Sequence, residues 1–231
     1  MTYAGLFKAW ATVLAAILVA ILLSTIALMI GAEQARAAGC TGKVVLDPGH
    51  GGTDSGAVNT NGLQEKVQTL NVANRLRDLL ANDGCTVYMT RTKDETLSNT
   101  QRANRANSFK ANDPGDYVLV SIHMNGSTNT SADYTTTLFG KWRKDKELAN
   151  TLFGSLSTLS AANATGTIAT RTPYSFASGV LLKSNMPATI AETVFITNDK
   201  EGQLLSDGTG ARQQQIAEAL KVGTENYLTT H

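Results

Sequence analysis

Short, β-branched apolar runs alternate with longer segments of helical periodicity from residue 40 onward. The short runs predict strands at residues 43–46, 86–90, 117–122, 133–139, 180–182 and 188–195. The longer segments predict helices at residues 65–83, 97–110, 145–159 and 210–227, and the small polar residues 161–176 predict a loop. This alternation favours a single α/β domain, with a mixed but mostly parallel sheet of about six strands and helices on both faces.

An uncharged, apolar stretch, Ala9–Ile30, predicts a hydrophobic helix ahead of that domain. At about 1.5 Å per residue this helix would span roughly 33 Å, enough for the hydrocarbon core of a membrane. Lys8 before the stretch predicts a cytoplasmic amino terminus and export of the remainder. Because Ala35–Gly39 also fits a signal-peptidase site, residues 1–39 are either a cleaved signal peptide or a membrane anchor with a short linker. Lipidation at Cys40 is a third alternative.

The charge of residues 40–231 is balanced. Of 20 basic and 19 acidic residues, 18 of each remain once Lys8, Arg36 and Glu33 are set aside. Without a basic arm or a block of like charge, nucleic acid is not an expected partner. We expect a monomer that is exported to the cell surface or cell wall, either secreted or membrane-anchored.

The only two cysteines, Cys40 and Cys85, each come just before a predicted strand. If those strands are parallel neighbours, both thiols lie at the same edge of the sheet and can form a disulfide. In an oxidising compartment such a bond would contribute about 3–4 kcal/mol in the chain-entropy model. The alternative is a pair of small, buried thiols.

Two of the three histidines, His50 and His123, end runs that resemble buried strands opening into a site. Glu65 begins the predicted helix between them. Imidazole and carboxylate are zinc ligands, and three protein ligands with a water are typical of a catalytic zinc. Glu192 lies among apolar residues near the end of the last strand and is a candidate general base. Taken singly, Glu65 could be a helix-start residue and Glu192 a salt-bridge partner.

These segments resemble the zinc-dependent N-acetylmuramoyl-L-alanine amidases, which cut bacterial peptidoglycan. The matching stretches are residues 46–52 with Asp54, 63–66, 90–91, 121–125 and 187–195, together with Arg102. The resemblance extends over almost all of residues 43–228. It implies His50, Glu65 and His123 as zinc ligands and Glu192 as the catalytic glutamate. The implied reaction hydrolyses the amide between the lactyl group of N-acetylmuramic acid and L-alanine.

Zinc in such a site lowers the pKa of a bound water to about 7, and Glu192 would accept its proton and pass it to the departing nitrogen. Around the ligands, Asp47 is expected either to orient an imidazole or to bind the glycine-rich loop. Asn125 is a candidate for shaping the cleft. Arg91 and Arg102 are expected to brace loops, although Arg91 is also a candidate substrate contact.

Two departures from the family pattern affect the expectations. The Gly-x-Glu that relatives have after the second histidine motif is missing, and Asp133 is a weak substitute for its glutamate. Some relatives carry a long inhibitory insertion at this position, whereas only a short stretch separates Asn125 from Lys141. We therefore expect an uncovered site that needs no activator protein.

Two other functions are compatible with these residues. The same ligands would serve a zinc peptidase or deacylase that acts on a different amide. A membrane-tethered module that binds the cell wall without catalysis is the second alternative, although a module of that kind has no need for a general base.

Overall fold

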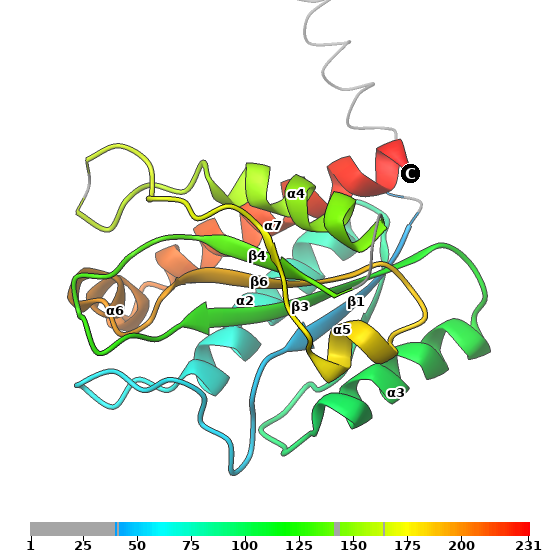
Figure 1. Ribbon diagram of the computed structural model, residues 1–231, viewed down its shortest axis with the longest axis horizontal. Helices are drawn as coiled ribbons and strands as arrows, with labels where there is room; N and C mark the ends of the chain where they lie inside the picture. Colours follow the sequence, from blue (N-terminus) through cyan, green and yellow to red (C-terminus); the bar gives the residue numbers. More distant parts are fainter. Residues whose placement is uncertain (1–39, 41, 141–143, 164) are drawn as a thin grey trace, which may run out of the picture. The chain divides into compact units, whose positions relative to one another are not determined.

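The sheet of this protein has six strands in the order β2-β1-β3-β6-β4-β5, seen in the computed structural model of Figure 1. The structure describes residues 40, 42–140, 144–163 and 165–231. The strands are β1 (Lys43–Pro48), β2 (Thr86–Met89), β3 (Tyr117–Asn125), β4 (Thr136–Phe139), β5 (Tyr174–Ser175) and β6 (Ala188–Phe195). The helices are α2 (Glu65–Asn82), α3 (Asn99–Asn112), α4 (Lys144–Leu156), α5 (Gly179–Lys183), α6 (Asp199–Ser206) and α7 (Ala211–Thr230).

Strands β2, β1, β3 and β6 are parallel, and β4 runs antiparallel to β6. This confirms the predicted mixed, mostly parallel sheet. Strand β3 lies at its centre with almost every residue buried, as expected for a strand covered on both sides. Its pairing with β6 places His123 directly beside Glu192.

Helices cover both faces of the sheet, each with its own apolar core. On one face, Val72, Leu76 and Leu80 of α2 follow helical spacing, are fully buried, and share a core with residues of α4 and α7. On the other face, α5 packs against α3, which begins with a capping box between Ser98 and Gln101. The two layers leave the carboxyl ends of the parallel strands as the edge where a site can form.

Three local predictions were wrong. Residues 180–182 form helix α5 rather than a strand, because three apolar residues do not distinguish the two periodicities and both Val180 and Leu181 are buried. Helix α6 was not predicted; its signal is Asn198, whose side chain accepts hydrogen bonds from the backbone of Lys200 and Glu201. The predicted loop at 161–176 ends in the two-residue strand β5.

Cys40 and Cys85 form a disulfide, as predicted from their position before two strands. Those strands, β1 and β2, are parallel neighbours with Lys43 opposite Thr86. The apolar stretch at residues 9–30 lies outside the described part of the chain. Among the helices that the structure does describe, none has the length and apolar character needed to cross a membrane.

Candidate metal centre

The loop that follows β1 presents His50 in an unusual backbone conformation. His50 has φ of 60°, in the left-handed region that non-glycine residues rarely adopt. Arg102 donates to the His50 carbonyl at 2.6 Å and to the Pro48 carbonyl at 2.6 Å. Arg91 donates to the carbonyls of Pro48 and Gly49 at 2.9 and 2.8 Å. Two nearly fully buried guanidinium groups therefore hold the loop in the strained geometry that aims the imidazole.

Glu65, the first residue of α2, contacts the imidazole rings of both histidines. Its Oε1 lies 3.1 Å from Nε2 of His50 and 3.1 Å from Nδ1 of His123. The backbone amides of Met124 and Ala57 each donate to the carboxylate at 2.9 Å. Burial alone would raise the pKa of Glu65, but the hydrogen bonds and charges of the two histidines outweigh it and hold the pKa far below its usual range. Glu65 is therefore a buried carboxylate whose surroundings favour its ionised form.

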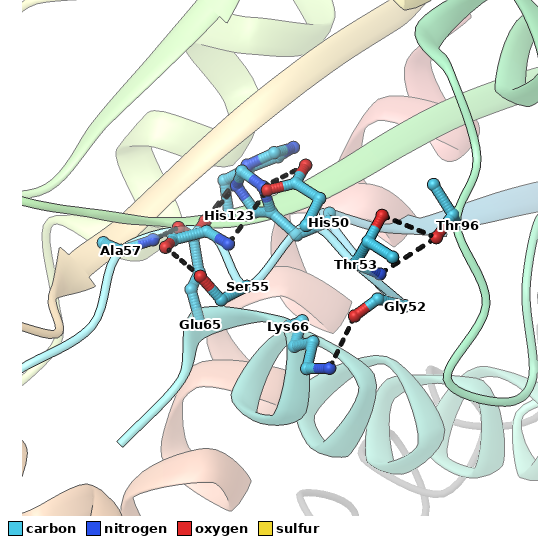
Figure 2. Close-up of polar contacts among 12 residues, drawn as sticks. His50, Gly52, Thr53, Ser55, Ala57, Glu65, Lys66, Thr96 and His123 are labelled. Atoms are coloured by element: carbon cyan, nitrogen blue, oxygen red, sulfur yellow. Dashed lines mark hydrogen bonds and ion pairs between the residues drawn. The ribbon is translucent and has the colours of Figure 1, made fainter. Parts of the chain in front are cut away.

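The donor set fits a small dication. The ligand atoms of His50, Glu65 and His123 all lie within 4.8 Å of one another. Tetrahedral zinc with bonds of about 2.0–2.1 Å separates neighbouring ligand atoms by roughly 3.3 Å, close to the 3.1 Å between Glu65 and each imidazole. Figure 2 shows the three side chains meeting beside the start of α2. Two neutral imidazoles and one carboxylate also leave coordination positions for a water or a substrate.

Asp54 contacts the ring nitrogen of His50 that faces away from Glu65. Its Oδ2 lies 2.9 Å from Nδ1 of His50, whose Nε2 faces Glu65. A carboxylate on the second nitrogen fixes the tautomer and orientation of a ligand histidine. Asp54 belongs to the family motif in the sequence, but the sequence alone indicates no role for it. The available signal was its spacing, four residues after His50 in a loop whose glycines allow it to fold back.

Two glycines allow the loop to approach the ligands closely. A Cβ on Gly49 would overlap the imidazole ring of His123. Gly56, with φ of +64°, faces the Glu65 carboxylate and the His50 ring, and a Cβ there would clash with both. Lys66 closes the loop from the helix side by donating to the Gly52 carbonyl at 2.8 Å (Figure 2). A side chain at Gly49 or Gly56 would therefore displace the three candidate ligands from one another.

Glu192 lies beside the centre without belonging to the ligand set. Its Cα pairs with that of His123 across β3 and β6. No hydrogen bond or ion pair joins its side chain to another residue in the described ranges. Burial raises the pKa of Glu192, with the nearby histidines acting in the opposite direction. A half-buried carboxylate with no partner and a raised proton affinity is suited to accept a proton.

The two possibilities expected for Asp47 are distinguished by its contacts. Both carboxylate oxygens are taken up, by Thr90 and Arg102 on one side and Ser121 on the other. Its side chain therefore anchors the strands below the loop, and orienting a ligand imidazole falls to Asp54 instead. Among the described residues, no hydrogen bond or ion pair joins Asp47 to either imidazole. Through Arg102, Asp47 supports the loop indirectly.

The remaining candidates lie near the centre but make different contacts. Arg91 braces the loop, and no substrate contact is needed to explain its burial. Asn125 ends β3 with its side-chain nitrogen buried and unpartnered among the described residues, so its role stays a prediction.

Burial raises the pKa of Asp133, while the charge of Arg212 opposes that shift. In the described ranges Asp133 makes no hydrogen bond or ion pair with the three candidate ligands.

The fold and the site together define an α/β protein in which two histidines and a glutamate could hold a metal ion beside a free carboxylate, an arrangement that fits metal-dependent hydrolases. A family model described as N-acetylmuramoyl-L-alanine amidase matches residues 44–226. The chain therefore belongs to the N-acetylmuramoyl-L-alanine amidase family of hydrolases. This confirms the resemblance found in the sequence.

Individual relatives agree with this assignment. The chain is 51% identical over 90 residues to the N-acetylmuramoyl-L-alanine amidase CwlM of Bacillus licheniformis, covering 38% of this chain and 33% of CwlM. It is 29% identical over 235 residues to AmiA of Escherichia coli, covering 84% of this chain and 79% of AmiA. The chain thus spans about a third of CwlM and about four fifths of AmiA.

A solved structure shares the fold. The catalytic domain of the amidase CwlV from Bacillus (Paenibacillus) polymyxa superposes with a TM-score of 0.71 at 29% identity. The match covers 83% of this chain and 100% of that domain.

Proposed function

We propose that this protein hydrolyses the amide between N-acetylmuramic acid and L-alanine in peptidoglycan, with zinc held by His50, Glu65 and His123. The observation that supports this most directly is the convergence of three ligand atoms within 4.8 Å beside the unpaired carboxylate of Glu192. Membership of the amidase family supports the choice of bond and substrate. When bound, zinc supplies a Lewis acid that polarises the carbonyl and lowers the pKa of a coordinated water.

The residues of the chain have separate tasks in this reaction. Glu192 accepts a proton from the attacking water and delivers it to the nitrogen of the departing L-alanine. Its raised pKa, caused by burial, brings its proton affinity nearer to neutral pH than that of an exposed glutamate. Asp54 keeps the Nε2 lone pair of His50 directed at the centre, and Arg102 keeps the His50 backbone in place.

The test combines metal analysis with digestion of purified peptidoglycan. Zinc bound at one equivalent and release of stem peptides with a free L-alanine amino terminus are expected. Glu192→Gln should lower turnover by about 10²–10⁴-fold while zinc content stays unchanged. Glu65→Gln should lose zinc, because it removes the charge of the only carboxylate ligand. Glu218→Gln, which removes the same charge on the exposed side of α7, is the control and should behave as the parent.

Each alternative has its own outcome in this experiment. Hydrolysis at the parental rate by Glu192→Gln would overturn the base assignment. Peptides released with another amino terminus would identify a peptidase or deacylase instead. Binding to the wall without any release of peptide would indicate a non-catalytic module.

An uncovered centre that works without an activator belongs to the same proposal. Residues 126–135, which join β3 to β4, contain no helix that could cover the zinc. The soluble domain beginning near Cys40 should therefore be active alone, and a strict requirement for an activator protein would refute this point.

The proposed place of action is outside the cytoplasm, at the cell wall. The Cys40–Cys85 disulfide supports an oxidising compartment. Residues 1–39 would serve as a signal peptide or membrane anchor, and the remainder as a monomeric catalytic domain. Sequencing the amino terminus of the protein recovered from cells distinguishes a cleaved signal peptide from a retained anchor.

A further inference from the structure

An exposed arginine on the segment before β5 is held in place by two tyrosines. The guanidinium carbon of Arg171 lies 4.9 Å from the ring centroid of Tyr174. Its Nη1 donates to the Tyr134 hydroxyl at 3.3 Å. Tyr134 is itself fixed by an edge-on contact with Phe195 at the end of β6, with ring centroids 4.6 Å apart. These contacts restrict a long side chain that would otherwise move freely in solvent.

The backbone places this arginine in the same sheet region as Glu192. The amide of Arg171 donates to the Thr135 carbonyl at 3.0 Å, and the Thr135 hydroxyl donates to the Glu192 carbonyl at 3.3 Å. Figure 1 shows the yellow segment that precedes α5 running along β4, which itself lies against β6.

The stacking partner of Arg171 lies on the face of the sheet that carries Glu192. Tyr174 pairs with Leu138, and Leu138 pairs with Ile190. Ile190 and Glu192 are two residues apart in β6 and so point to the same face. Burial raises the pKa of the Tyr174 phenol, the charge of Arg171 opposes that shift, and the charge of Glu192 acts in the same direction as burial.

The guanidinium of Arg171 forms no ion pair with the described residues. Among the described residues, no carboxylate lies within ion-pair distance of its guanidinium, and its side chain makes one hydrogen bond, to Tyr134. By contrast, Arg102 and Arg212 each have a buried carboxylate partner. A guanidinium has five N–H donors in a planar fork that matches a carboxylate in bidentate geometry. Most of these donors remain available to a ligand.

We propose that Arg171 binds a carboxylate of the peptidoglycan stem peptide and so selects substrates whose peptide is acidic. This inference rests on the proposed amidase function: it takes the peptide to lie across β4, the strand between β5 and β6, when its first amide bond reaches Glu192. Arg171 is a specificity-determining residue in this arrangement. Tyr134 and Tyr174 are positioning residues that act through it.

The test uses two synthetic N-acetylmuramoyl peptides that differ at one group. The residue after L-alanine carries a free carboxylate in one and a carboxamide in the other. The zinc-loaded full chain should show a KM about tenfold lower for the acid, as one charge-assisted contact provides. Arg171→Gln should remove that preference by raising KM for the acid, with kcat within about twofold. Tyr134→Phe, which keeps the ring, should weaken the preference less.

A charge-matched control separates a local contact from the general field of the protein. Arg77→Gln on α2 removes the same charge from a residue that contacts Asp78 and Asn74, and it should retain the full preference for the acid. An equal effect of Arg171→Gln on both substrates, or equal KM values for acid and amide in the parent, would overturn the proposal.

Failure of the proposed function has a different signature. If the parent hydrolyses neither substrate, the amidase assignment fails. Calorimetric binding of the free stem peptide, acid against amide, then still tests Arg171. Tighter binding of the acid that Arg171→Gln abolishes supports the contact. Equal binding of acid and amide refutes it.

Discussion

Asp54 and His50 form a carboxylate–imidazole pair, with 2.9 Å between Oδ2 and Nδ1, on a loop turn that places His50 at φ of 60°. The pair matters because Nε2 of the same ring faces Glu65 at 3.1 Å. One carboxylate therefore sets the tautomer, while the other lies on the side of the candidate metal site. The hydrogen bonds and charges of Asp54 and Glu65 raise the pKa of His50, although burial opposes them.

Replacing Asp54 should weaken metal binding without unfolding the protein. Asp54→Asn keeps the shape but removes the negative charge that fixes the His50 ring, and we expect zinc affinity to fall by about 10–100-fold. Competition with a chromogenic chelator measures this directly. Asp78→Asn, an exposed carboxylate on α2, is the matched control. Parental affinity in Asp54→Asn would show that the orientation of His50 does not depend on this pair.

Much of the site could be predicted from the sequence because it follows from strong local patterns. His50 and His123 come after buried β-branched strands, and parallel strands bring their carboxyl ends to one edge. Glu65 begins a helix whose apolar spacing is clear. Convergence of these residues depends only on topology, which the alternation of strands and helices already indicates.

The contacts around the ligands could not be predicted in the same way. Asp47 looks equivalent to Asp54 in sequence, since both are close to His50 in a glycine-rich stretch. Because side chains alternate between the two faces of a strand, Asp47 points to the face opposite Leu46. On that face its carboxylate accepts hydrogen bonds from Arg102 and Ser121. Asp54 instead follows a turn made possible by positive φ at three successive residues, 50–52, which no periodicity predicts.

Removing Arg102 should cost stability far more than removing its neighbour Arg105. Arg102 forms a buried pair with Asp47, with side-chain exposures of 3% and 0%. Arg102→Gln leaves that carboxylate buried and uncompensated, for an expected loss of about 3–5 kcal/mol. Arg105 pairs with Glu95 at 41% and 25% exposure, so Arg105→Gln should cost less than about 1 kcal/mol. Urea unfolding of both variants measures the difference, and equal losses would contradict this explanation.

Loss of the disulfide should lower the free energy of unfolding by about 4 kcal/mol. Cys40 and Cys85 are 45 residues apart, and in the chain-entropy model a loop of that size restricts the unfolded chain by about this amount. The double variant Cys40→Ser/Cys85→Ser should match the parent protein measured in excess reductant. A parent whose unfolding is insensitive to reductant, and equal to the variant, would show that the bond adds no stability.

The ion pair between Lys43 and Asp113 should make part of the stability depend on acid pH. Hydrogen bonds from Lys43 and from the Tyr88 hydroxyl, at 2.8 Å in the latter case, hold the pKa of Asp113 below its ordinary value of 3.8. A lowered pKa means that the folded state favours the ionised form. The stabilisation is therefore complete above the unfolded pKa and is lost as pH falls through the folded one.

Asp113→Asn should accordingly lower Tm at about pH 6, and the gap to the parent should narrow by about pH 3.5. Asp116→Asn removes a charge from the same turn, at a side chain with no hydrogen bond or ion pair to the residues described, and is the control. A Tm gap that is constant over this range would mean that Asp113 acts through shape rather than through its charge. A gap that widens on acidification would reverse the sign of the pKa shift.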